Sequence, residues 1–356
     1  MSLLLCLEKI LEFLLEFGLF LAKSVTVLVA ILITIAFIAG SSQRQKPADS
    51  GHIEVKNLNE SLEAVTQSLK NMVLNPEARK VDSKQEKKRH KEIQKNLKKD
   101  AKSGAENRGR LFVIDFKGDI QASEVTSLRE EITAILSVAS DRDEVLVRLE
   151  SPGGVVHGYG LAASQLQRVR NRGVPLVVAV DKVAASGGYM MACIANHIIA
   201  APFALLGSIG VVAQLPNFHR LLQKNDIDFE VLTAGEFKRT LTVFGENTDK
   251  AREKFVDDLE DVHKLFKDFV TEHRPAVAIE EVATGEAWFG RRALERNLID
   301  ELKTSDEYLV HKCEEMDVFQ VRYVLHKHKL DRLMDKVTKL MLPSVSRHSI
   351  PEQHIG

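Results

Sequence analysis

The 356-residue chain has few of the residues that mark metal, redox or disulfide chemistry. Its three cysteines, Cys6, Cys193 and Cys313, lie far apart and match no zinc-ligand spacing, so we expect neither a thiolate metal site nor a disulfide framework. The sequence contains no His-Glu-x-x-His, no P-loop and no Gly-x-Gly-x-x-Gly motif. A formal net charge of −1 favours no class of charged partner over the whole chain. We therefore expect no metal and no cofactor.

A long uncharged stretch near the N-terminus predicts a membrane anchor over residues 1–40. Ser24–Gly40 carries no charged residue, and together with Phe17–Ala22 it is long enough to cross about 30 Å of hydrocarbon. A cleaved signal peptide is the alternative, because Ala39-Gly40-Ser41 resembles a cleavage site. We favour the anchor, since the apolar stretch is longer than usual and the leader before it is acidic instead of basic. The few flanking basic residues do not decide the orientation of the anchor.

Residues 41–109 have the composition of a charged linker. From Arg79 to Arg110 there are 13 Lys or Arg against 5 Asp or Glu. No aromatic residue interrupts this run to stack on a nucleic-acid base, so we expect a solvated linker and no nucleic-acid partner, with binding to anionic lipid as the alternative. Within the linker, the spacing of Leu and Val over 53–74 predicts a short amphipathic helix.

The composition of residues 326–356 predicts an amphipathic, basic C-terminal tail. Apolar side chains recur on one helical face of 326–342, with Lys and Arg elsewhere. Such a segment is typical of a helix that lies on a membrane surface or of a helix that packs in an oligomer, and both interpretations stay open.

Apolar strands alternate with amphipathic helices between residues 110 and 325. We expect strands at 111–116, 145–149, 176–180, 197–200, 229–232 and 317–324, and helices at 125–136, 157–172, 185–196, 221–222 and 252–272. Near-continuous apolar strands separated by helices are typical of a parallel sheet covered on both faces. The sequence therefore predicts one α/β domain over 110–325.

Three glycine-rich turns follow predicted strands, at Ser151–Gly154, Ser186–Gly188 and Gly207–Gly210. In a parallel sheet such turns gather beyond the carboxyl ends of the strands, where sites usually form. Ser186 opens a predicted helix, whose first N–H groups can stabilise an oxyanion. Lys238 can act as a base for this serine only if its surroundings lower its pKa. On spacing alone, an exposed lysine is the simpler interpretation.

Four motifs in fixed order resemble the S49 peptidases, the signal peptide peptidase A family. They are Ser151-Pro152-Gly153-Gly154, Ala185-Ser186-Gly187-Gly188-Tyr189, Gly207-Ser208-Ile209-Gly210 and Gly235-Glu236-Phe237-Lys238. The resemblance covers about residues 110–302 and implies a ClpP/crotonase-like fold, built from turns of a β-β-α superhelix. It implies Ser186 as the nucleophile, Lys238 as the general base and Ser208 as the hydroxyl that orients the lysine.

The resemblance also implies the surroundings of the catalytic pair. Backbone N–H groups of Gly153 or Gly154 and of Gly187 match the oxyanion donors of the family. Phe237 stands where the family leads us to expect tyrosine, a change of packing more than of chemistry. Family members assemble as rings or domes whose sites use neighbouring subunits, so we expect a homo-oligomer.

We expect a serine endopeptidase anchored in a membrane by a single span. The resemblance implies that this membrane is the bacterial inner membrane and that the catalytic domain is periplasmic. Its substrates would be extended, hydrophobic peptides such as remnants of signal peptides. One alternative is a crotonase-type acyl-CoA enzyme, because paired glycine N–H groups also stabilise thioester enolates. The other is a catalytically inactive membrane scaffold.

Overall fold

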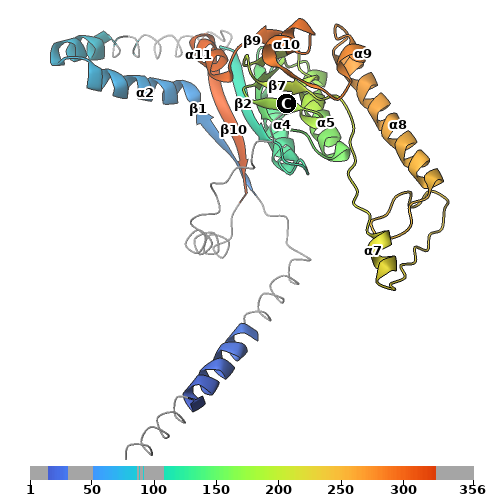
Figure 1. Ribbon diagram of the computed structural model, residues 1–356. Helices are drawn as coiled ribbons and strands as arrows, with labels where there is room; N and C mark the ends of the chain where they lie inside the picture. Colours follow the sequence, from blue (N-terminus) through green and yellow to red (C-terminus); the bar gives the residue numbers. More distant parts are fainter. Residues whose placement is uncertain (1–14, 31–50, 86–87, 89–90, 92–107, 326–356) are drawn as a thin grey trace, which may run out of the picture. The chain divides into compact units, whose positions relative to one another are not determined.

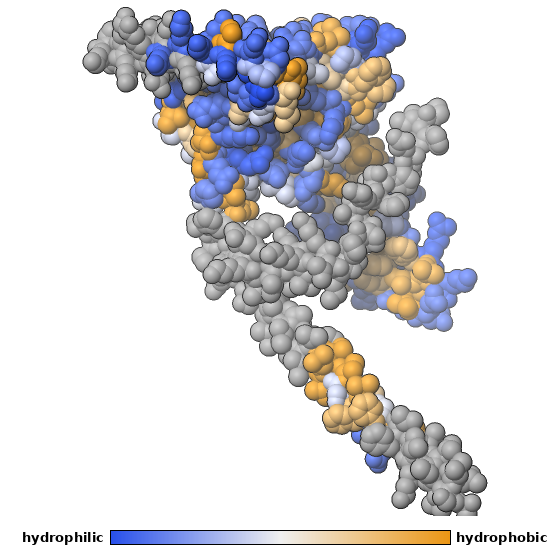
Figure 2. All heavy atoms as spheres, turned by 90° about the vertical axis from the view of Figure 1, so that its left-hand side faces the viewer, coloured by the Kyte–Doolittle hydropathy of each residue, from blue (hydrophilic) through white to orange (hydrophobic). Residues whose placement is uncertain are grey.

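The computed structural model describes residues 15–30, 51–85, 88, 91 and 108–325 (Figure 1). The chain divides into two units, Met1–Gly51 with Leu325–Gly356, and His52–Val324. In the first unit, residues 15–30 form a helix of exposed and largely hydrophobic side chains (Figure 2). The remainder of the expected anchor, 31–40, and the tail at 326–356 lie outside the described residues. No described helix combines the length and the apolar character needed to cross a membrane.

A seven-stranded sheet forms the centre of the unit His52–Val324 (Figure 1). Its spatial order is β1 (His52–Asn57), β10 (Asp317–Val324), β2 (Arg110–Lys117), β3 (Glu144–Glu150), β4 (Leu176–Val180), β6 (His197–Ala200) and β9 (Glu301–Leu302). Every neighbouring pair is parallel except β1 and β10. The predicted parallel sheet therefore holds from β10 to β9, and the antiparallel edge strand β1 makes the whole sheet mixed.

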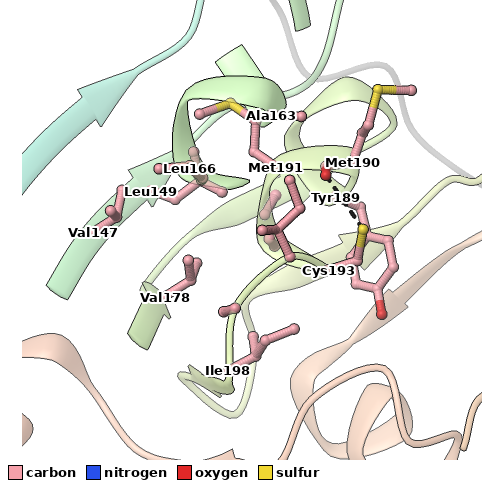
Figure 3. Close-up of a cluster of buried hydrophobic side chains, with 14 of the residues drawn as sticks. Val147, Leu149, Ala163, Leu166, Val178, Tyr189, Met190, Met191, Cys193 and Ile198 are labelled. Atoms are coloured by element: carbon pink, nitrogen blue, oxygen red, sulfur yellow. Dashed lines mark hydrogen bonds between the residues drawn. The ribbon is translucent and has the colours of Figure 1, made fainter. Parts of the chain in front are cut away.

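The interior strands are apolar on both faces because each face is covered. Residues of one parity, such as Leu111, Val113 and Leu146, pack with α11 (Ser305–Glu315). The other parity packs with α4 (Val125–Val138), α5 (Val156–Asn171) and α6 (Gly187–Ala192), as the period of two in a strand requires. Figure 3 shows part of this larger cluster, where Val147, Val178 and Ile198 of the strands meet Leu166 of α5 and Met191 of α6.

The sheet edge includes residues that the composition places in the linker. β1 is followed by α2 (Leu58–Val73). The helix predicted over 53–74 is therefore correct for α2 but wrong for its first residues, which form β1. The Asn59 side chain donates hydrogen bonds to the carbonyls of Cys313 (2.9 Å) and Met316 (3.1 Å), and accepts one from the N–H of Val318 (2.7 Å). These bonds attach the start of α2 to the end of α11 and the start of β10. Residues 52–73 thus belong to the compact unit.

A second, three-stranded sheet carries two of the glycine-rich turns. Its strands are β5 (Val183–Ala185), β7 (Leu205–Gly207) and β8 (Ala287–Phe289). β5 and β7 are parallel, and β8 runs antiparallel to β7. The chain alternates between the sheets, since β4 and β6 lie in the large sheet and β5 and β7 in the small one. The small sheet therefore places the turns at Ser186 and Ser208 at the same edge.

The helical second half is only partly packed. α8 (Asp249–His273) matches the predicted long helix, but only Phe266 and Val270 on it are buried. It is followed by α9 (Ile279–Val282) and α10 (Gly290–Glu295).

The segment 211–248 holds little regular structure beyond the short helix α7 (His219–Lys224). The predicted strand at Phe229–Leu232 is wrong: these residues form no strand, because no neighbouring strand pairs with their backbone. The segment instead exposes many large apolar side chains. They are Val212, Leu215, Phe218, Leu221, Ile227, Phe229, Val231, Leu232, Phe237 and Phe244.

Candidate active site

Ser186 occupies a strained turn between β5 and α6. Its backbone has φ +52° and ψ −118°, a region that costs a residue with a side chain about 1–3 kcal/mol and is found mostly at functional sites. Its N–H donates to the carbonyl of Gly207 (2.7 Å), and its carbonyl accepts from the N–H of Met190 (3.0 Å). Ser186 is half-buried between buried neighbours. The turn therefore presents a serine hydroxyl at the N-terminus of a helix.

The Ser151–Gly154 turn lies directly against Ser186. A methyl group on Gly153 would fall 2.7 Å from the Ser186 Cβ and 2.9 Å from the Gly187 nitrogen. Gly153 also has φ +91°, which favours glycine. A methyl group on Gly154 would overlap the carbonyl of Ile120. Since only glycine fits at both positions, the backbone of this turn reaches the serine without an intervening side chain.

Two buried hydroxyl groups connect this turn to the core. The Ser151 Oγ and the Tyr159 OH are 2.6 Å apart, and both residues are 0% exposed. Tyr159 donates to the Asp119 carbonyl (2.7 Å), and Ser151 Oγ accepts from the Gly153 N–H (3.1 Å). Burial raises the pKa of Tyr159 above its ordinary value, which keeps its hydroxyl protonated.

The hydrogen bonds show which of the candidate oxyanion donors already has a partner. The Gly153 N–H already has a partner in Ser151. The N–H of Gly187 is the first of α6, and the first N–H groups of a helix have no carbonyl in a preceding turn. Of the predicted donors, Gly187 and Gly154 thus remain compatible with an oxyanion site, and Gly153 serves the shape of the turn.

Ser208 lies next to the Ser186 turn through the small sheet. It also has a positive φ, +49°. Its Oγ donates to the Gly285 carbonyl (3.2 Å), and its N–H donates to the Glu286 carbonyl (2.7 Å). Because Ser186 donates to Gly207, the residue before Ser208, the structure brings these two serine turns together.

Lys238 is exposed in the segment 211–248. Its backbone N–H donates to the Gly235 carbonyl (3.2 Å), but among the described residues its ammonium group forms no hydrogen bond or ion pair. The neighbouring Glu236 pairs with Lys250 (2.5 Å). Within the described parts of one chain, Lys238 therefore forms no hydrogen bond with Ser186 or Ser208, while the turns at Gly153 and Gly207 lie against Ser186.

A hollow of about 420 Å³ lies beside Lys238, not beside Ser186. Phe229, Phe237 and Thr242 are among its lining residues. None of the lining residues belongs to the three glycine-rich turns. The hollow is therefore a feature of the segment 211–248 and the first turn of α8, and not of the nucleophile turn.

Other reactive groups lie apart from this site. Cys193 is completely buried, and burial raises the pKa of its thiol well above the ordinary value. In the described parts of the chain, no group of three His, Cys, Asp or Glu side chains is placed to hold a metal ion. The serine hydroxyl of Ser186 is thus the best-placed nucleophile.

Sequence reasoning overlooked Gly118 and Tyr159. A methyl group on Gly187 would fall 2.7 Å from the Tyr159 Cβ, so the tyrosine ring lies flush against the nucleophile turn. A methyl group on Gly118 would fall 2.8 Å from the Ser151 Cβ, beside both buried hydroxyls. The helical pattern of 157–172 does not distinguish a tyrosine beside a site from one in the core. The Gly118-Asp119 pair predicts only the end of a strand.

The comparison with known proteins agrees with these motifs. The family model "Peptidase family S49 N-terminal" matches residues 12–166, and "Peptidase family S49" matches residues 168–318. "Probable protease SohB" of Haemophilus influenzae is 50% identical over 337 residues, which are 94% of this chain and 95% of that protein. "Probable protease SohB" of Buchnera aphidicola subsp. Acyrthosiphon pisum is 59% identical over 232 residues, 65% of this chain and 69% of that protein.

Solved structures show a weaker likeness. A membrane-bound stomatin-specific protease, 1510-N, is 14% identical with a TM-score of 0.38, over 58% of this chain and 86% of that chain. A likeness at this level does not bear on the fold. The sequence relatives do decide the family, since they are bacterial proteases that match this chain over most of its length. The chain belongs to peptidase family S49 and is a SohB-type serine peptidase.

Proposed function

We propose that the chain is an endopeptidase in which Ser186 is the nucleophile and Lys238 the general base. The observation that carries the proposal is the strained Ser186 turn at the start of α6, with the backbone of Gly153 against it. A nucleophile on such a turn, beside the first backbone N–H groups of a helix, suits acyl transfer. The N–H groups of Gly154 and Gly187 are the proposed oxyanion donors.

The proposed reaction needs a lysine that is neutral before attack. Lys238 Nζ takes the proton of Ser186 as Oγ bonds to the peptide carbonyl carbon, and passes it to the leaving amine as the C–N bond breaks. Water, deprotonated by the same lysine, then attacks the acyl carbon, and the proton passes from the lysine to Ser186 Oγ as the ester bond breaks. A lysine is neutral near pH 7 only when it is desolvated or beside other cations. Ser208 would hold the ammonium form by accepting a hydrogen bond.

We infer that Lys238 reaches Ser186 of a neighbouring copy of the chain. Lys238 is exposed in one chain, and the segment that carries it exposes the apolar side chains named above. Such a set of exposed apolar residues is typical of an interface. A neighbouring subunit that covers this segment would also remove Lys238 from water, which lowers the pKa of an ammonium group. The proposal is therefore a homo-oligomer, as a ring or dome, with shared sites.

The proposal also covers the type of fold, the class of substrate and the location of the protein. The alternation of β4 and β6 with β5 and β7 supports a ClpP/crotonase-like superhelix. An apolar inner surface of a ring would favour extended, hydrophobic peptides such as signal-peptide remnants. The uncharged stretch 24–40 and the hydrophobic helix at 15–30 support a single-pass membrane anchor (Figure 2). The inner membrane as its location, and the periplasm as the side of the catalytic unit, follow from the family resemblance alone.

Substitution of each proposed residue in the full chain, purified in detergent, tests this function. We expect Ser186→Ala to abolish casein cleavage and labelling by a fluorophosphonate probe, and Lys238→Ala to lower both by at least about 1000-fold. Ser164→Ala and Lys56→Ala are the matched controls, since both side chains are exposed and lie outside the proposed site and the segment 211–248. Full cleavage by Ser186→Ala would exclude it as the nucleophile, and full cleavage by Lys238→Ala would exclude it as the base.

A further inference from the structure

A directed chain of hydrogen bonds runs from the glycine turn into the core. The Asp119 carbonyl can only accept, so the single hydrogen of the Tyr159 hydroxyl is committed to it (2.7 Å). Tyr159 must then accept the hydrogen of Ser151 Oγ (2.6 Å). Ser151 Oγ in turn accepts from the Gly153 N–H (3.1 Å). The order is therefore Gly153 N–H, Ser151 hydroxyl, Tyr159 hydroxyl, Asp119 carbonyl, with every hydrogen used once.

This chain of bonds joins the turns that surround the nucleophile. Its ends lie on the turn after β2, at Asp119, and on the turn after β3, at Gly153. The Tyr159 ring packs against Gly187, the residue after Ser186. Ser151 also pairs with β5 through its backbone, because its N–H donates to Val183 (2.8 Å) and its carbonyl accepts from Ala185 (3.0 Å). Ser151 and Tyr159 thus contact the turns after β2 and β3, strand β5 and the start of α6.

The bonds also decide which way the glycine turn faces. Because Ser151 Oγ holds the Gly153 N–H, the peptide before Gly153 is fixed and φ of Gly153 is held at +91°. The N–H of Gly154 belongs to the next peptide, so its position depends on the constrained Gly153. Its place is set further by Val155, whose N–H donates to the Ile120 carbonyl (2.9 Å). Buried hydrogen-bond chains whose groups are all satisfied are rigid, which suits a device that aims a donor.

We propose that Tyr159 and Ser151 are positioning residues that aim the Gly154 N–H at the oxyanion. The inference rests on the proposed function and adds to it two side chains that never touch the substrate. If the pair only filled the core, a phenyl ring at position 159 would serve as well, since it preserves the packing on Gly187. If the pair aims the turn, loss of either hydroxyl releases Gly153 and impairs acylation.

Tyr159→Phe and Ser151→Ala in the full chain test the inference. We expect each to lower kcat for peptide cleavage and the rate of fluorophosphonate labelling by about 10- to 100-fold, with KM unchanged, because a misplaced donor weakens the transition state and not substrate binding. We expect amide hydrogen exchange at Gly153 to become faster in both. The double variant should lose no more activity than either single variant, because the two hydroxyls act through one series of hydrogen bonds. Tyr308→Phe, which removes a buried hydroxyl that donates to Glu144 in the other core cluster, should label at the unaltered rate.

The possible outcomes separate the inference from the proposed function. Faster exchange at Gly153 with unaltered labelling would overturn the inference while leaving the Ser186 mechanism intact. Losses that multiply in the double variant would also overturn it, since they would show two independent effects. An unaltered chain that neither cleaves nor labels would overturn the proposed function and this inference together. The inference would be supported by slow labelling and fast exchange at Gly153 in both variants, together with a normal labelling rate in Tyr308→Phe.

Discussion

Arg274 forms a two-pronged ion pair with Asp300, with Nη1–Oδ2 and Nη2–Oδ1 distances of 2.8 and 2.9 Å. Asp300 also accepts from the N–H of Ile198 (2.7 Å), and Arg274 donates to the carbonyl of Asn297 (2.8 Å). Burial alone would raise the pKa of Asp300, but hydrogen bonds from Arg274 and Ile198 outweigh it and lower the pKa. The pair therefore joins the end of α8 to the start of β6.

Arg274→Ala should destabilise the folded unit by about 2–4 kcal/mol. The Arg274 side chain is 10% exposed and that of Asp300 29% exposed, so removal of the arginine leaves a partly buried, unpaired carboxylate. Urea unfolding measures the loss. Arg292→Ala, which removes an exposed pair with Glu295 on α10, should cost less than about 1 kcal/mol. Equal losses in the two variants would contradict a structural role for the Arg274 pair.

Glu131 should make the fold less stable as the pH rises from about 4.5 to about 7. Burial is the main cause that raises its pKa to about 7, against the hydrogen bond from the Tyr323 N–H. The native state then holds a proton that the unfolded chain has lost, so the free energy of unfolding falls through this window. The loss reaches at most about 3 kcal/mol at pH 8.

Glu131→Gln is the matched test of that titration. Its amide oxygen can still accept from the Tyr323 N–H, which lies 2.8 Å from Glu131 Oε1. We expect the variant to match the unaltered chain at pH 5 and to be more stable at pH 8, as judged by urea midpoints. A constant difference at both pH values would show that Glu131 does not titrate in this range.

Co-expression of two inactive variants should restore activity if the site is shared between copies. An assembly of Ser186→Ala chains and Lys238→Ala chains then contains intact pairs at about a quarter of its sites, since each site draws its serine and its lysine from different subunits. Differently tagged chains and a fluorophosphonate labelling assay would measure this. Ser186→Ala co-expressed with the Ser186→Ala/Lys238→Ala double variant should stay inactive. No recovery in the first mixture would place both residues in one chain.

Gly153→Ala should abolish peptidase activity, because the methyl group would lie 2.7 Å from both the Ser186 Cβ and the Ala185 carbonyl oxygen. The added cost of a positive φ on alanine is about 1 kcal/mol or more. Gly160→Ala in the interior of α5 is the control: no atom beyond the local backbone of the helix lies within 4 Å of the added carbon, and helix propensity favours the change by about 0.5–1 kcal/mol. Cleavage at the normal rate by Gly153→Ala would show that the turn does not approach Ser186 as described.

The large sheet was predictable because its strands are long apolar runs. Leu176–Val180 can be predicted as a strand without knowledge of its neighbouring strands, because five consecutive apolar residues bounded by turn residues are typical of a buried strand. The three-residue strands β5, β7 and β8 were not predicted, because their pattern is too short and runs into glycine turns. Phe229–Leu232 has the composition of a strand, but a strand requires a neighbour, and composition does not supply one.

The candidate site divides in the same way. Ser186, Ser208 and the glycines stand in contiguous motifs, so local sequence is enough to single them out. Tyr159 matters through contacts with Ser151, Asp119 and Gly187, which depend on how several elements pack. Such a role leaves no local signal. In the proposed shared site, the position of Lys238 relative to Ser186 depends on how copies of the chain assemble, and the sequence pattern of one chain does not express this.

The pairing of β1 with β10 has a mechanical consequence. His52 lies opposite Val324, so the two extensions of the unit leave it one strand spacing apart, about 5 Å. A force that pulled these extensions in opposite directions would load the six residue pairs one after another, from His52 and Val324 inward. Hydrogen bonds loaded in sequence yield as a zipper does, at far lower force than bonds sheared together. Under tension β1 would therefore peel away first, and the parallel strands that hold the Ser186 turn would stay intact.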